Sequence, residues 1–185
     1  MRYEVEQKFP VADPPALAEK LAALGATLSE TRTELDVYYA HPARDFAATD
    51  EALRIRRTDR ADSITYKGPK IDATTKTRRE IDLPLPPDES HAAGWGTLLE
   101  ALGFTPVGEV CKYRRKAFVP WQDRSVEVSM DDVVGLGTYV ELELVTEEED
   151  VEAAKACIAS LAGHLGLSES ERRSYLQLLL QNESG

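Results

Sequence analysis

Residues 3–9, Tyr3-Glu4-Val5-Glu6-Gln7-Lys8-Phe9, alternate charged side chains with mostly apolar ones. In an extended strand every second side chain shares a face, so this segment predicts a strand with Glu4, Glu6 and Lys8 on one side. The opposite side would carry Tyr3, Val5 and Phe9 and would need an apolar partner such as a helix. The charged side would then face a polar interior.

The same alternation returns in later segments, at Arg54/Arg56, Arg78/Glu80/Asp82, Lys112/Arg114 and Glu141/Glu143. For any one pair the ordinary explanation is a solvated sheet face with cross-strand ion pairs. That explanation suits the whole set less well, because some of these segments are purely acidic and others purely basic. Like charges on one strand repel, so the set indicates a shared interior that binds a metal-bound polyanion.

Turn and cap signals divide the chain into two halves, each predicted as strand, helix, strand, strand, strand. Strands are expected at residues 1–9, 31–40, 51–58, 63–67, 77–85, 109–119, 125–131 and 138–145, and helices at about 14–24 and 95–102. The Ala-Leu-Gly sequence at residues 23–25 recurs at residues 101–103, at the same place in the order. Eight strands are enough to close a small barrel.

Two more helices are expected after the strands, one from Asp150 and one led by Ser168-x-x-Glu171 as a capping box. Their apolar stripes would cover the outside of the barrel. The predicted fold class is therefore α+β, with a single domain over residues 1–185. Its barrel would occupy about residues 1–146 and its covering helices about residues 150–182.

Composition excludes several functions. The 185 residues carry a formal net charge of -11, which disfavours nucleic acid and anionic membrane surfaces as partners. With neither a leader nor an apolar run of roughly 20 residues, we expect a cytoplasmic protein. Cys111 and Cys157 lack metal-ligand spacing and are interpreted as reduced thiols, and the three scattered histidines give no support for a catalytic triad.

The candidate residues for the charged interior comprise seven basic and seven acidic side chains. The basic ones are Lys8, Arg54, Arg56, Lys67, Arg78, Lys112 and Arg114, and the acidic ones are Glu4, Glu6, Glu80, Asp82, Asp131, Glu141 and Glu143. A triphosphate of about -4 bound with two divalent cations would keep such an interior near neutral. Carboxylates are suited to Mg²⁺ or Mn²⁺, and arginine and lysine to phosphate oxygens.

Together with the stretches 36–56, 65–69 and 173–179, the Glu4-x-Glu6-x-Lys8 pattern resembles the CYTH superfamily of triphosphate tunnel metalloenzymes. Within it, the chain is most similar to the CyaB-type class IV adenylyl cyclases. The resemblance implies an eight-stranded antiparallel tunnel, a nucleoside triphosphate or inorganic triphosphate substrate, two Mg²⁺ or Mn²⁺ ions and a homodimer.

The resemblance also assigns roles. It implies metal binding by Glu4, Glu6, Asp131, Glu141 and Glu143, and triphosphate binding by Lys8, Arg54, Arg56, Lys67, Arg78, Lys112 and Arg114. Glu80 and Asp82 are supporting candidates. Lys8, Glu6 and Arg114 are the catalytic candidates, with Lys8 or a metal-bound hydroxide as the base.

The leading hypothesis is conversion of ATP to cyclic AMP and pyrophosphate. A triphosphatase that acts on tripolyphosphate, thiamine triphosphate or a nucleotide could use the same tunnel, and a module that binds triphosphate without turnover also stays open. A lipocalin-like carrier would need an apolar interior, which the alternation of charges disfavours.

Overall fold

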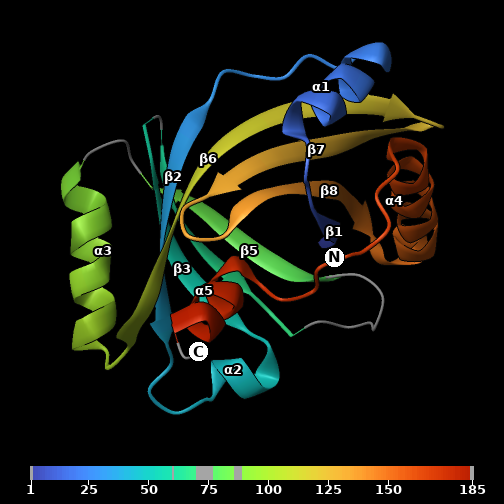
Figure 1. The fold of residues 1–185 in the computed structure, drawn as a ribbon. Helices are drawn as coiled ribbons and strands as arrows, with labels where there is room; N and C mark the ends of the chain where they lie inside the picture. The colour runs from blue at the N-terminus through green and yellow to red at the C-terminus, as the bar shows by residue number, and fades with distance from the viewer. Residues whose placement is uncertain (1, 60, 70–76, 86–88, 184–185) are drawn as a thin grey trace.

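Eight antiparallel strands close into a barrel in the computed structural model, which describes residues 2–59, 61–69, 77–85 and 89–183 (Figure 1). The strands are β1 (Arg2–Pro10), β2 (Arg32–Ala40), β3 (Ala52–Thr58), β4 (Asp62–Lys67), β5 (Arg78–Leu85), β6 (Thr105–Trp121), β7 (Arg124–Val133) and β8 (Gly137–Glu147). The helices are α1 (Pro14–Ala23), α2 (Phe46–Thr49), α3 (Glu89–Ala101), α4 (Val151–Leu165) and α5 (Tyr175–Glu183), with a 3₁₀ turn at Glu148–Asp150. The predicted α+β barrel is confirmed.

The order of strands around the barrel is β1-β5-β4-β3-β2-β6-β7-β8, and β8 pairs again with β1. If β1 is exchanged with β5, β2 with β6, β3 with β7 and β4 with β8, every strand in the ring keeps the same pair of neighbouring strands. Both halves therefore have the same topology, as the repeated Ala-Leu-Gly sequence predicts. Gly25 and Gly103 follow α1 and α3 with φ angles of 79° and 90°, a left-handed conformation that favours glycine at helix ends.

The apolar core lies outside the barrel, between its wall and the helices. Val5 and Phe9 of β1 pack there with Leu21 of α1 and with Ile158 and Leu161 of α4. A smaller cluster joins α3 to the barrel through Leu99, and another joins α5 through Leu178. Figure 1 shows α3 and α4 on opposite sides of the barrel. Because the apolar side chains face outward, the interior is left to the charged ones.

The capping box expected at Ser168 and Glu171 is wrong. Helix α5 begins at Tyr175, and its cap is formed by Ser174: the Gln177 amide donates to Ser174 Oγ, and the Ser174 amide donates to Gln177 Oε1. Glu171 instead binds Arg173 through its carboxylate. The four-residue helix α2, capped by Asp45, was not predicted from the sequence.

Two further expectations concern cysteines and membranes. Cys111 and Cys157 are both free thiols. In the described ranges, every helix is too short or too polar to cross a membrane.

Candidate functional site: a charged cavity inside the barrel

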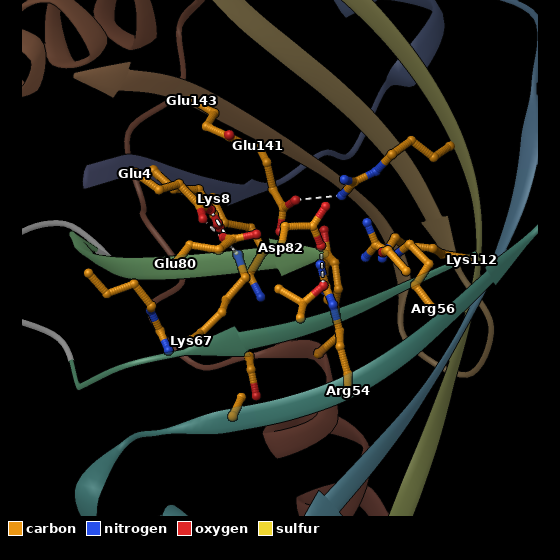
Figure 2. Close-up of a pocket in the computed structure, with 18 of the residues that line it drawn as sticks. Glu4, Lys8, Arg54, Arg56, Lys67, Glu80, Asp82, Lys112, Glu141 and Glu143 are labelled. Carbon is orange, nitrogen blue, oxygen red and sulfur yellow. Dashed lines mark hydrogen bonds and ion pairs between the residues drawn. The ribbon is translucent and has the colours of Figure 1, made fainter. Parts of the chain in front are cut away.

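A cavity of about 240 Å³ lies inside the barrel, and every strand except β7 contributes to its lining (Figure 2). Apart from Asp131, all the site residues predicted from the sequence line it: Glu4, Glu6, Lys8, Arg54, Arg56, Lys67, Arg78, Glu80, Asp82, Lys112, Arg114, Glu141 and Glu143. Tyr38, Ser174 and Tyr175 line it as well and were not predicted as site residues. Figure 2 shows Glu4, Glu80 and Glu143 on one side and Arg56 and Lys112 on the other. We call these sides the acidic wall and the basic wall.

The acidic wall is built by β1, β5 and β8 around one lysine. Lys67 Nζ lies 2.9 Å from both carboxylate oxygens of Glu4 and 2.8 Å from Glu80 Oε2. Burial, followed by the charges of Glu4 and Glu6, raises the pKa of Glu143 to about 8 in spite of the opposing charge of Lys67. The pKa of Glu4 is also raised, chiefly by burial. Lys67 therefore does not cancel the effect of burial on the carboxyl groups of Glu4 and Glu143.

The basic wall is organised by two buried carboxylates of β2, Glu34 and Asp36. Arg56 forms a two-pronged contact with Asp36, with Nε 2.6 Å from Oδ1 and Nη2 2.7 Å from Oδ2. Arg54 Nη1 and Lys112 Nζ reach the same carboxylate at 3.2 and 3.1 Å. Glu34 lies 3.1 Å from both Arg56 Nη1 and Lys112 Nζ.

Sequence reasoning missed Glu34 and Asp36 as site residues. Their spacing in β2 is the same two-residue alternation that singled out Glu4 and Glu6. The sequence shows this spacing, but it does not show which side chains form ion pairs with Glu34 and Asp36. They depend on β2 lying between β3 and β6, which puts Asp36 opposite Arg56 and Glu34 opposite Lys112.

Arg114 joins the two walls. Its guanidinium binds Asp131 through Nε at 2.6 Å and Nη2 at 2.5 Å, and Nη2 also contacts Glu141 at 2.5 Å. The Tyr175 hydroxyl donates to Asp131 Oδ2 at 2.8 Å. Both oxygens of Asp131 are thus engaged and the residue does not line the cavity, so metal binding by Asp131 stays a prediction.

Lys8 is held by the segment that precedes α5. Its Nζ donates to the Arg173 carbonyl at 2.6 Å and lies 3.9 Å from the centroid of the Tyr175 ring. The Glu171 amide donates to the Lys8 carbonyl at 2.7 Å, which fastens this segment to β1. The C-terminal part of the chain therefore fixes the position of one cationic side chain in the cavity.

The carboxylates of the cavity are the candidates for a metal site. Within the described residues, no three or more His, Cys, Asp or Glu side chains stand together as a ready metal cluster. Glu4, Glu6, Glu141 and Glu143 nevertheless line one cavity, and Glu6 pairs directly with Glu143 across β1 and β8. Carboxylate oxygens are the ligands that hard divalent cations prefer, and a cation would offset the charges of Glu4 and Glu6, which add to burial in raising the pKa of Glu143. The donor set therefore fits a divalent metal.

Comparison with known proteins identifies similar chains over almost the full length. The CYTH domain model matches residues 2–175. A protein of Methanocaldococcus jannaschii, named "Putative adenylate cyclase MJ0240", is 34% identical, with 95% of this chain and 97% of that protein covered. Adenylate cyclase CyaB of Aeromonas hydrophila is 30% identical, with coverage of 98% and 91%.

Solved structures agree on the fold. The PH1819 protein of Pyrococcus horikoshii OT3 superposes with a TM-score of 0.85 and is 39% identical, with 97% of this chain and 99% of that chain covered. HpAC1 of Hippeastrum, described as having a dominant triphosphatase activity, has a TM-score of 0.64 and 19% identity, with coverage of 98% and 96%. At that identity the likeness to HpAC1 shows the fold alone.

Proposed function

The chain belongs to the CYTH domain family, and we propose that it is a divalent-metal-dependent adenylate cyclase that converts ATP to cyclic AMP and pyrophosphate. The observation that carries this proposal is a single cavity in which a basic wall faces an acidic one. The family binds triphosphate substrates and implies the use of a divalent metal. The names of the two relatives that are at least 30% identical support the choice of reaction.

The basic wall would hold the triphosphate. Arg54, Arg56 and Lys112 lie together on one side, and Arg114 reaches between the two walls. Guanidinium forks and ammonium groups form charge-assisted hydrogen bonds to phosphate oxygens, which are about twice as strong as neutral ones. Lys67 and Arg78 line the same cavity and extend this set.

The acidic wall would hold the metal through Glu4, Glu6, Glu141 and Glu143, with Mg²⁺ or Mn²⁺ as the expected ions. A bound divalent cation supplies Lewis acidity and charge neutralisation at phosphate oxygens. Asp131 and Tyr175 would contribute by keeping Arg114 in place.

In the proposed reaction the ribose 3′-oxygen forms a bond to the α-phosphorus, and the bond from that phosphorus to the pyrophosphate oxygen breaks. Negative charge develops on the departing pyrophosphate, which the basic wall would stabilise. The 3′-hydroxyl must also lose its proton. Lys8, whose Nζ is fixed by the Arg173 carbonyl, is the candidate on this chain for handling that proton.

Hydrolysis of a triphosphate is the second candidate function. The residues that line the cavity are almost all charged or hydroxyl-bearing, and they suit a triphosphate better than an adenine ring. Water directed at the γ-phosphorus in the same cavity would give a triphosphatase.

Product analysis separates the two reactions. The wild type is incubated with Mg²⁺ or Mn²⁺ and either ATP, GTP or tripolyphosphate, and we expect cyclic AMP and pyrophosphate from ATP. Glu6→Gln keeps the size of the side chain but removes a ligand charge, so it should lose turnover by about two orders of magnitude or more while keeping its fold.

Three outcomes would contradict the proposal. Tripolyphosphate has no ribose to cyclise, so its hydrolysis at a rate far above the consumption of ATP would replace the cyclase by a triphosphatase. Tight binding of triphosphates without any turnover would indicate a binding module. Wild-type turnover in folded Glu6→Gln would remove Glu6 from the site.

A further inference from the structure

The carboxylate of Asp36 has the surroundings of a bound phosphate group. It is fully buried and accepts hydrogen bonds from three cationic side chains. Arg56 donates at 2.6 and 2.7 Å, Lys112 at 3.1 Å and Arg54 at 3.2 Å. These donors come from β3 and β6, the strands on either side of β2. The two-pronged contact with Arg56 is the geometry with which arginine binds phosphate as well as carboxylate.

Asp36 is ionised in this environment. Burial alone would raise the pKa of its carboxyl group, but the charges of Arg54 and Lys112 and the hydrogen bonds from Arg56 outweigh burial and hold the pKa well below its usual range. A buried negative charge therefore sits where the basic residues of the cavity converge. Those same residues are the ones expected to bind the triphosphate (Figure 2).

We propose that Asp36 is a positioning residue that stands in for a phosphate group when no triphosphate is bound. It holds Arg54, Arg56 and Lys112 together as one wall, and it competes with an incoming triphosphate for their hydrogen bonds. This inference rests on the proposed binding of triphosphate in the cavity but not on which reaction follows. It assigns a role to a residue that does not itself line the cavity.

Two opposite consequences follow from removing the charge. Without the Asp36 carboxylate, Arg56 and Lys112 keep Glu34 as a shared counter-ion, and buried charges that lose a partner are strongly destabilising. The free protein should therefore become less stable. An added polyanion should bind more tightly, because donors that Asp36 now occupies would be available to it.

Asp36→Asn tests both consequences with tripolyphosphate as the probe, in EDTA and again in Mg²⁺. Thermal melting should show a lower melting temperature than the wild type without ligand and a larger rise when tripolyphosphate is added. Titration calorimetry should show about tenfold tighter binding, the size expected when one charge-assisted hydrogen bond need not be displaced. Equal or weaker binding by the folded variant, or an unchanged melting temperature without ligand, would overturn the proposal.

Glu51→Gln is the matched control. The Glu51 side chain is 5% exposed, accepts from Arg44 Nη1 at 3.0 Å and from the Tyr66 hydroxyl, and does not line the cavity. Its loss should lower the melting temperature but leave the response to tripolyphosphate at the wild-type value. Absence of tripolyphosphate binding by the wild type in both EDTA and Mg²⁺ would instead count against the triphosphate cavity itself.

A double variant covers the case in which Asp36→Asn does not fold alone. In Asp36→Asn/Lys112→Gln the cation left without its partner is also neutralised, so this protein should melt above Asp36→Asn and lose the tenfold gain in affinity. Recovery of folded Asp36→Asn only in tripolyphosphate would support the proposal as well. Failure of both variants to fold, with or without tripolyphosphate, would overturn it, because charge balance would then not be what Asp36 supplies.

Discussion

Adjacent residues of β3 face opposite sides of the barrel wall, so that Arg56 lines the cavity while Arg57 is exposed. Replacing Arg56 or Lys112 by alanine should weaken binding of tripolyphosphate by about 1.5–3 kcal/mol, the range for hydrogen bonds to charged groups. Both variants should fold, because the apolar core lies outside the cavity. Calorimetry measures the change, and Arg57→Ala, on the same strand, should bind like the wild type. Wild-type affinity in folded Arg56→Ala would exclude that residue from the site.

The raised pKa of Glu143 leads to a prediction of how the stability of the metal-free protein depends on pH. Its pKa is raised from 4.5 to about 8, first by burial and then by Glu4 and Glu6. Between these two values the folded state holds a proton that the unfolded state has lost, so stability falls as pH rises. The contribution is fully present below about pH 4.5 and is lost as pH passes through about 8.

Melting temperatures of the wild type and Glu143→Gln in EDTA, from pH 5 to pH 8, check this prediction. The wild type should lose stability across the window, whereas the glutamine variant should show a flatter profile and melt above the wild type at pH 8. Parallel profiles for the two proteins would show that Glu143 is not the group responsible.

At the scale of residues, the alternation of charges predicted most of the charged side chains that line the cavity, but not Tyr38, Ser174 or Tyr175. The alternation could not predict the hydrogen-bond and ion-pair partners of each side chain, because these depend on which strands are neighbours in the barrel. Asp36 shows this limit: its three cationic partners are 18 to 76 residues away along the chain. Asp131 shows it too, since the resemblance implied a metal ligand there and gave no sign that its oxygens bind Arg114 and Tyr175.

Helix α5 has two candidate capping boxes ahead of it, Ser168-x-x-Glu171 and Ser174-x-x-Gln177. The local pattern cannot choose between them, because both serines precede a glutamate or glutamine by three residues. Tertiary contacts decide: the Glu171 amide and the Arg173 carbonyl are both bound to Lys8, which holds this segment out of a helix. Helices with strong local signals, such as α1 with its prolines after Asp13, were predicted correctly.

Ser174→Ala should therefore destabilise the protein by about 1 kcal/mol, the usual cost of losing a serine cap. For a chain of this size the melting temperature should fall by about 2–4 °C. Ser168→Ala is the matched control and should have little effect, since Ser168 is exposed and lies outside any helix. Equal losses in the two variants, measured by thermal melting, would contradict the assignment of the cap to Ser174.

Across the whole molecule, the topology gathers like charges on each side of the cavity, even though Lys67 lies within the acidic wall and Asp36 within the basic wall. Neighbouring strands β1 and β8 bring Glu6 directly opposite Glu143, and β3 and β6 flank β2 with their basic residues. Like charges opposite one another on a sheet are destabilising. The acidic wall thus calls for a cation and the basic wall for an anion, and a metal-bound triphosphate supplies both in one ligand.

Metal and triphosphate together should therefore stabilise the protein more than either does alone. At a ligand concentration about 100 times the dissociation constant, binding linkage gives about 2.7 kcal/mol. For a chain of this size that corresponds to a rise in melting temperature of about 5–10 °C. The measurement is thermal melting with Mg²⁺ or Mn²⁺, with ATP or tripolyphosphate, and with both. AMP with the same metal serves as the control, because it lacks the triphosphate that the basic wall would bind. A melting temperature unmoved by saturating metal and ATP would mean that the two walls are structural ion-pair networks rather than the two halves of one binding site.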